Sequence, residues 1–123
     1  YDLTNLKTSF RNYKHIINHH KYSNNYNYQK TIKLMNSEEF IDGGYFILCE
    51  SKNYAPPISI IYFEYYIDIE GVKKKIMSKN NEIQCVVSNL KIKNSISFGN
   101  AQNPKLNQYA DNIDTLKFLL TSS

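Results

Sequence analysis

The sequence predicts an α/β fold in which a small, mainly parallel sheet carries flanking helices. A polar segment with helical periodicity, residues 1–36, precedes a segment of short apolar runs, residues 40–88. The runs at 45–49 and 58–63 are apolar on both faces, which is typical of strands covered on both sides. A helical pattern leads from the second run to a third at 83–88, and a helix between strands indicates a βαβ crossover. With 123 residues and 41% hydrophobic content, the chain can form a core.

The helical front, residues 1–36, has apolar residues at spacings of three and four, which places them on one helix face. They are Leu3, Leu6, Phe10 and Tyr13, and Ile16 and Ile17 continue the stripe. The pair Asn24-Asn25 interrupts this pattern, and asparagine is a good N-cap. We therefore expect a second helix to begin near Asn25 or Asn27 and to end at Asn36-Ser37.

The strand-strand-helix-strand unit, residues 40–88, begins with the turn sequence Ile41-Asp42-Gly43-Gly44. A loop at 51–55 and Pro56-Pro57 separate the first two predicted strands. Asp68 is placed to cap a helix over about 69–77. In that helix Ile69, Val72 and Ile76 share one side, and Lys73, Lys74 and Lys75 form a solvated face.

The rest, residues 89–123, reads as an irregular loop and a closing helix. The loop is polar and contains Gly99 and Pro104. Asp114 can cap the helix, whose leucines at 116, 119 and 120 would dock on the body. The whole chain is thus interpreted as a single domain or as a fragment of one.

Composition limits the classes of partner. The net charge is +4 and the pI near 9.0, but Arg11 is the only arginine, whereas phosphate-binding surfaces commonly use arginine forks. Asn, Ile, Lys and Tyr all have A/T-rich codons, so codon bias can raise the lysine content. These points disfavour nucleic acid as a partner. Cys49 and Cys85 each lie in an apolar run, which indicates buried free thiols in a protein of the cytoplasm. No apolar run approaches the roughly 20 residues of a membrane span.

Residue types that carry chemistry form only incomplete patterns. His15 and His19 share a helix face at i, i+4, with His20 beside them, but a zinc site needs three or four ligands, so no metal is expected. Cys85 has no cationic neighbour in sequence to activate it as a nucleophile. Asp111 and Asp114, three apart, fit either an acid–base pair or a cap and a loop residue. Neither GxGxxG nor GxxxxGK[ST] occurs.

Three stretches, in order, carry a family resemblance. The first runs from Ile17 to Tyr28 and leads into residues 33–36; the second combines residues 57–59, 63–66 and 83–88; the third joins 98–104 to 109–111 and 114–119. Together they resemble the C-terminal third of acyl-CoA reductases of Bacteroidetes-type bacteria. These enzymes are relatives of the fatty acid reductase of bacterial bioluminescence, in the aldehyde dehydrogenase superfamily. The resemblance covers nearly the whole chain, and its first and third stretches are the specific ones.

The resemblance implies a mechanism and partners. In this family a cysteine thiolate attacks a fatty acyl-CoA thioester, and hydride from NADPH reduces the acyl-enzyme to the aldehyde. The nucleophile and the dinucleotide-binding domain lie upstream of the matched region, so this segment alone is expected to be inactive. It would be the last part of an aldehyde-dehydrogenase-like catalytic domain, packed against the rest of that domain and available for homo-oligomer contacts.

The resemblance also bears on single residues. Residues 54–60 resemble the Glu-x-Phe-Gly-Pro-Val segment of aldehyde dehydrogenases, but Asn53 stands where their ribose-contacting glutamate would be, which puts that contact in doubt. Phe98, Gly99 and Gln102 are candidates for lining the active site, because their loop precedes the closing helix; an ordinary turn explains them too. The alternative function is a non-enzymatic module whose basic surface binds protein or nucleic acid.

Overall fold

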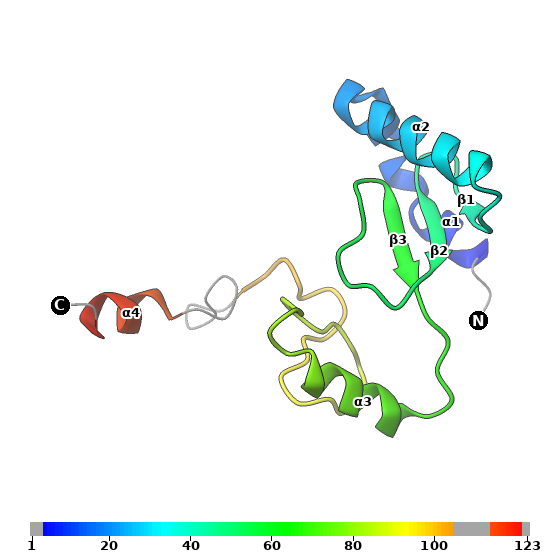
Figure 1. Cartoon of the computed structure of the whole chain (residues 1–123). Helices are drawn as coiled ribbons and strands as arrows, with labels where there is room; N and C mark the ends of the chain where they lie inside the picture. The colour runs from blue at the N-terminus through cyan, green and yellow to red at the C-terminus, as the bar shows by residue number, and fades with distance from the viewer. Residues whose placement is uncertain (1–3, 105–113, 122–123) are drawn as a thin grey trace. The chain divides into compact units, whose positions relative to one another are not determined.

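The computed structural model describes residues 4–104 and 114–121, and the chain divides into two compact units, Tyr1–Tyr65 and Tyr66–Ser123 (Figure 1). The first unit contains helix α1 (Thr4–Ser9), the 3-10 helix η1 (Arg11–Asn18), helix α2 (His20–Met35), and strands β1 (Ile41–Asp42), β2 (Ile47–Glu50) and β3 (Ile60–Phe63). The second contains helices α3 (Ile69–Ser78) and α4 (Thr115–Thr121). The predicted α/β class, with a small sheet and flanking helices, is confirmed.

The sheet has the order β1-β2-β3 and is mixed. Strand β1 pairs antiparallel with β2, placing Ile41 opposite Leu48, and β2 pairs parallel with β3, placing Ile47 opposite Ile60. The predicted strands at 45–49 and 58–63 thus correspond to β2 and β3. The extra antiparallel strand arises because Ile41 and Asp42, predicted as part of a turn, pair with β2 before the chain turns at Gly43-Gly44.

The predicted βαβ crossover is wrong. Residues 51–59, a loop, join the two parallel strands, and α3 follows β3 without leading back to the sheet. The third predicted strand, 83–88, forms one isolated bridge, between Val87 and Ile96. Its backbone bonds locally instead, since the Ile96 N–H donates to the Val86 carbonyl at 2.8 Å. Because this run does not enter the sheet, Cys85 is exposed rather than buried, whereas Cys49 is buried as predicted and both thiols are free.

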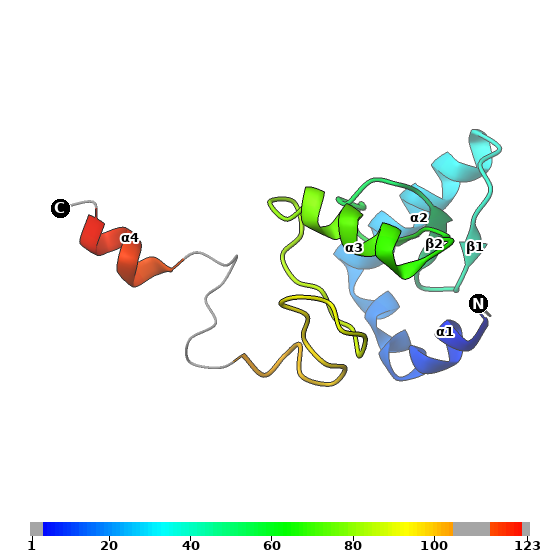
Figure 2. The ribbon, with the colours of Figure 1, turned by 90° about the horizontal axis from the view of Figure 1, so that it is seen from below.

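Strand β2 is buried on both faces, and this organises the first unit. Ile47 and Cys49 pack with Tyr26 of α2, whereas Leu48 packs on the opposite face with residues of the α1 and η1 segment. Alternation of side chains along a strand produces this division. Figure 2 shows β1 and β2 lying between α2 and α1. Ile47 and Leu48 are the largest fully buried side chains in the described residues.

The helical front breaks at a different residue from the predicted one. His19 has an extended ψ of 112° between η1 and α2, and α2 continues through Asn24-Asn25. Polar side chains are satisfied inside α2, where Asn25 Nδ2 donates to the Lys21 carbonyl at 2.8 Å, and burial of Tyr26 fixes the helix on the sheet. The predicted end of α2 is confirmed: Met35 is its last residue, and Ser37 has a positive φ of 54°.

Both predicted aspartate caps are confirmed. Asp68 Oδ1 accepts a hydrogen bond from the Gly71 N–H at 2.7 Å, and Asp114 Oδ1 accepts one from the Lys117 N–H at 3.0 Å. In α4 the side chains Leu116, Leu119 and Leu120 are 61–80% exposed, and their docking on the body stays a prediction. Capping is a local interaction and follows from local sequence, whereas docking requires a partner surface.

Candidate functional site

The three sequence-predicted active-site residues lie in exposed turns. Phe98 is 66% exposed, and its N–H donates to Asn89 Oδ1 at 3.2 Å. Gly99 has a φ of +83°, which favours glycine, and Gln102 is exposed in the turn that follows. Each position has a local turn role. Residues 105–113, including Asp111 of the predicted acid–base pair, lie outside the described residues.

The histidines do not form the face that was expected. The break at His19 separates it from His15 of η1, so the two no longer share one helix. His15 Nδ1 lies 3.0 Å from the Asn12 carbonyl oxygen, a local contact. In the described part of the chain, no group of three or more His, Cys, Asp or Glu side chains is placed to hold a metal ion.

The segment resembling the ribose-contacting loop has one unusual residue. The Asn53 N–H donates to Ser51 Oγ at 3.2 Å, and the side chain is exposed. Ser59 has a φ of +75°, is 8% exposed, and its hydroxyl has no hydrogen-bond partner among the described residues. Its carbonyl nevertheless accepts the Ile47 N–H at 2.8 Å, so the strained residue lies at the start of the parallel pairing with β2.

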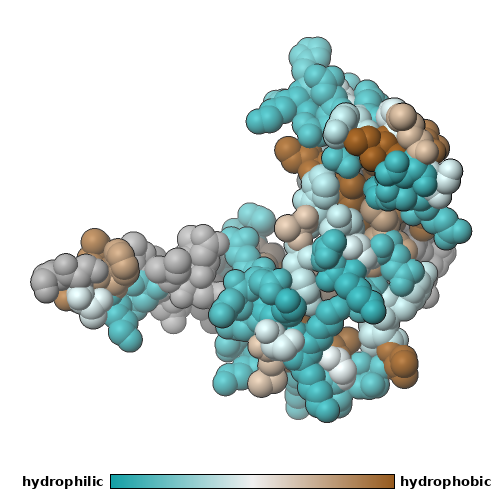
Figure 3. Space-filling view, viewed as in Figure 1, coloured by the Kyte–Doolittle hydropathy of each residue, from teal (hydrophilic) through white to brown (hydrophobic). Residues whose placement is uncertain are grey.

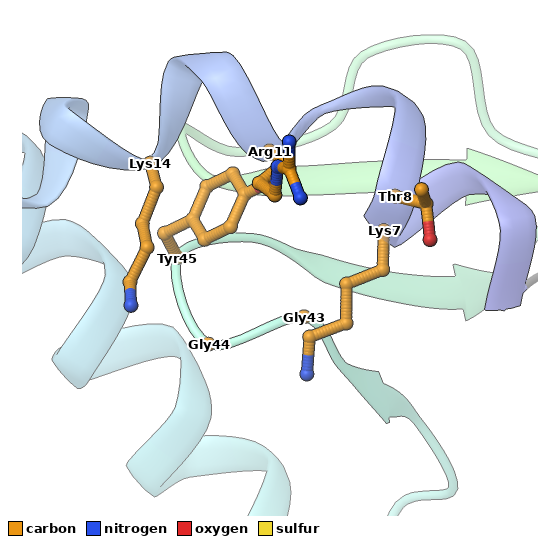
Figure 4. A pocket seen from close by; sticks show the side chains of 7 residues that line it. All are labelled: Lys7, Thr8, Arg11, Lys14, Gly43, Gly44 and Tyr45. Atoms are coloured by element: carbon orange, nitrogen blue, oxygen red, sulfur yellow. The ribbon is translucent and has the colours of Figure 1, made fainter.

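A cationic cleft in the first unit is a candidate site. Its volume is about 430 Å³, within the roughly 300–1,000 Å³ of small-molecule sites. The lining residues are Lys7, Thr8, Arg11, Lys14, Gly43, Gly44 and Tyr45. Figure 4 shows the Lys7 and Lys14 side chains extending from α1 and η1 toward the Gly43-Gly44 turn, with the Tyr45 ring between Lys14 and Arg11. We refer to these seven residues as the cationic cleft.

The helical segments place the three cations on one side of the chain. Lys7, Arg11 and Lys14 follow each other at spacings of four and three, so they share a face along α1 and η1. The neighbouring face carries Leu6 and Phe10, which pack on Tyr45, Phe46 and Leu48. Burial of that apolar face leaves the cations beside it, where the Lys7 and Lys14 side chains extend toward the Gly43-Gly44 turn.

The other wall requires two glycines. A Cβ on Gly43 would lie 2.5 Å from Phe46 Cε1, and Gly44 has a φ of +86°. A side chain at residue 43 would therefore clash with the Phe46 ring, and a side chain at residue 44 would strain the backbone. The Phe46 ring in turn packs edge-on against Phe10 at a centroid distance of 5.5 Å. The turn is thus held close to the core.

Asp42 ties this turn to α2. Its Oδ1 accepts hydrogen bonds from the Gly44 N–H at 2.7 Å and from the Tyr26 hydroxyl at 2.5 Å, and its Oδ2 pairs with Lys30 Nζ at 2.7 Å. Burial raises the pKa of the Asp42 carboxyl, but the hydrogen bonds from Lys30, Tyr26 and Gly44 outweigh it, so that pKa lies below its usual value. Burial, followed by the bond to Asp42, raises the pKa of Tyr26 far above its usual value.

The charges in the cleft are not neutralised within the described residues. No carboxylate in residues 4–104 or 114–121 forms an ion pair with Lys7, Arg11 or Lys14, and the nearby Asp42 carboxylate is taken up by Lys30. Tyr45 is 5% exposed, and its hydroxyl is buried without a hydrogen-bond partner in the same residues. A cleft lined by three cations is suited to an anion.

Sequence reasoning missed this cleft. The spacing of Lys7, Arg11 and Lys14 beside the apolar stripe of the helical front is the signal in the sequence that could have indicated one cationic face. The second wall was not visible, because nothing local places Gly43-Gly44 opposite residues about thirty positions earlier in the sequence. Arg11, the sole arginine of the chain, served as an argument against nucleic-acid binding and was not recognised as a member of a cationic cluster.

Comparison of the chain with protein-family models, curated proteins and solved structures finds no match. Among the described residues, none of the helices has the length and apolar character needed to cross a membrane.

Proposed function

We propose that this chain is the C-terminal segment of an NADPH-dependent acyl-CoA reductase that converts a fatty acyl-CoA thioester to an aldehyde. The observation that carries the proposal is the ordered resemblance of three stretches, beginning at Ile17, Pro57 and Phe98, across nearly the whole chain. Under this proposal the fold is the end of an aldehyde-dehydrogenase-like catalytic domain in the cytoplasm. The acylated cysteine lies upstream, and the segment contributes packing, channel lining and oligomer contacts.

The open sheet supports this role. In the described residues β3 pairs only with β2, so its other edge is available to a further strand. The residues directly after β3 are exposed and apolar: Tyr65 and Tyr66 are each 66% exposed, and Ile67 is fully exposed. Leu116 and Leu120 of α4 are also exposed, and Figure 3 shows apolar surface over that helix. Such surfaces are typical of a segment that packs against more protein.

The cationic cleft is chemically suited to the phosphate groups that acyl-CoA and NADPH both carry. When bound, NADPH supplies the hydride for reduction. The residue at the position of the ribose-contacting glutamate is Asn53, which lacks that carboxylate. We therefore expect the nicotinamide end of the cofactor to be bound by upstream residues.

The test is NADPH oxidation with a long-chain acyl-CoA, measured for this chain and for the same chain joined to its natural upstream portion. Activity in the extended protein alone is the expected result. In the absence of NADPH, mass spectrometry should find the acyl group on an upstream cysteine, and Cys85→Ser should leave the rate unchanged. A folded extended protein with neither activity nor acylation contradicts the proposal and favours the interaction module.

A further inference from the structure

We propose that the outer edge of β3 is an interface at which two copies of this chain pair their β3 strands antiparallel, about a two-fold axis at Tyr62. The inference concerns the first unit of the chain alone and does not depend on the proposed reductase function. None of its tests uses reductase activity as a readout, so the two proposals can fail separately.

The outer edge of β3 presents backbone groups that pair best with another strand. The Phe63 carbonyl accepts the Ser51 N–H at 3.1 Å, so the backbone groups of Phe63 face β2. Successive residues of a strand direct these groups to opposite sides, and those of Tyr62 therefore face away from β2. Among the described residues, no backbone group outside the sheet forms a hydrogen bond with Tyr62.

The side chains of β3 define the kind of strand that fits this edge. Ile60 and Tyr62 pack in the cluster that contains Tyr26 of α2, whereas Ile61 and Phe63 pack on the opposite face. Except for Ile60, these side chains of β3 are only half-buried, so both apolar layers stop short at this strand. A strand that continues the sheet must therefore be apolar on both faces.

The β3 strand of a second copy meets this requirement. Open edges are commonly protected from such pairing by lysine or proline, and β3 carries neither, because its four residues are all β-branched or aromatic. The other edge strand of the sheet, β1, has two residues, one of which is Asp42. Self-association through the sheet is therefore expected at β3 and not at β1.

The charge pattern selects the antiparallel direction. Glu64 is the sole charged residue between positions 57 and 67. Parallel pairing in register would place Glu64 opposite its own copy, and like charges directly opposite each other are destabilising. Antiparallel pairing about Tyr62 places Glu64 opposite Ile60 instead. It also places Ile61 opposite Phe63, and a β-branched side chain opposite an aromatic one stabilises a sheet.

The same register covers exposed apolar side chains at both ends of β3. Ile58, in the turn before the strand, is 49% exposed, and Tyr65, just after it, is 66% exposed. Because Glu64 of one copy lies opposite Ile60 of the other, Tyr65 of the first copy reaches the turn that carries Ile58 of the second. Within its own chain the Tyr65 ring packs edge-on against Phe63, at a centroid distance of 5.5 Å, which holds it beside the strand.

Sedimentation equilibrium of the 123-residue chain, under reducing conditions, tests the interface. We expect a monomer–dimer equilibrium. Tyr65→Lys should raise the dissociation constant at least about tenfold, because each copy then places a charge against an apolar turn. Tyr28→Lys is the matched control, since Tyr28 is 61% exposed on α2 and should leave the constant unchanged. A chain that stays monomeric, or equal effects of the two variants, overturns the proposal.

Disulfide trapping tests the register, in a Cys85→Ser background that removes the exposed thiol. Residues opposite each other in a hydrogen-bonded antiparallel pair have Cα atoms about 5.5 Å apart, which is within disulfide range. Tyr62→Cys should therefore give a covalent dimer under mild oxidation. In Tyr65→Cys the two thiols would lie about 20 Å apart along the strands, so that variant should stay monomeric on a denaturing gel. Any other pattern, including covalent dimers of both variants as parallel pairing would give, overturns the proposal.

Discussion

Asp42 is the residue whose loss tests the architecture most directly, because it joins the core, the turn and α2. Replacing it by alanine removes the acceptor of the Tyr26 hydroxyl, the acceptor of the Gly44 N–H, and the ion pair with Lys30. Tyr26 is 5% exposed, so its hydroxyl cannot turn to water without unpacking α2 from the sheet. Asp42→Ala therefore leaves a buried donor unpaired.

The expected magnitude follows from these three contacts. An unpaired buried hydroxyl costs about 1–3 kcal/mol and the turn bond about 1 kcal/mol, and the partly exposed ion pair contributes at most about 1 kcal/mol. We expect Asp42→Ala to lower the free energy of unfolding by about 3 kcal/mol. Tyr26→Phe should cost about 1.5 kcal/mol in the wild-type chain. In the Asp42→Ala background it should cost nothing or stabilise, because it removes the orphaned hydroxyl.

Urea unfolding followed by far-UV circular dichroism measures this cycle, since the chain has no tryptophan. Asp68→Ala is a matched control, because it also removes one negative charge and one acceptor of a backbone N–H. Asp68, however, caps α3 in the second unit. We expect it to cost about 1 kcal/mol and to show no coupling with Tyr26→Phe. Additive effects of Tyr26→Phe and Asp42→Ala would refute the assigned hydrogen bond.

Three further outcomes concern the Gly43-Gly44 turn, Asp42 and the two cysteines. Gly44→Ala should lower the free energy of unfolding by about 1 kcal/mol because residue 44 has a positive φ. Gly43→Ala should lower it by more, because the new Cβ would clash with the Phe46 ring. Negligible effects of both substitutions would contradict this turn geometry. Folding lowers the pKa of the Asp42 carboxyl, so the stability that the ionised carboxylate adds is present above the unfolded pKa of 3.8 and is lost as the pH falls through the folded pKa. The difference in urea midpoint between the wild type and Asp42→Asn should therefore shrink below about pH 4. A thiol reagent should modify exposed Cys85 quickly and buried Cys49 only on unfolding, and equal rates would contradict their placement.

Local interactions made part of the fold predictable. Asp68 and Asp114 cap helices because each needs only an acceptor placed three residues before a backbone N–H, and this spacing is present in the sequence. The apolar run around Ile47 was recognised as a covered strand because both its faces are apolar. These features depend on few residues outside the segment itself.

Tertiary contacts decided the features that were mispredicted. Asn24-Asn25 has the composition of a break, yet Tyr26, one residue later, is buried against β2 and keeps the helix continuous. Residues 83–88 have the composition of a strand, but strand pairing needs a partner edge, and the Val86 carbonyl bonds to Ile96 instead. The cationic cleft needs two distant segments to face each other, so the sequence supplied only its helical wall.

Asp42 also separates two explanations of anion binding in the cationic cleft. Asp42→Asn and Asp42→Ala remove the same negative charge next to the cleft, but an asparagine oxygen can still accept the Gly44 N–H and hold the turn. If charge alone determined affinity, both variants would bind inorganic pyrophosphate, the probe anion, more tightly, by less than about fivefold for one exposed charge. If the Gly43-Gly44 wall is part of the site, Asp42→Asn should bind more tightly and Asp42→Ala more weakly than the wild type, each measured where the chain is fully folded. The same increase in both variants would leave the three cations of α1 and η1 as a charged surface without a shaped site.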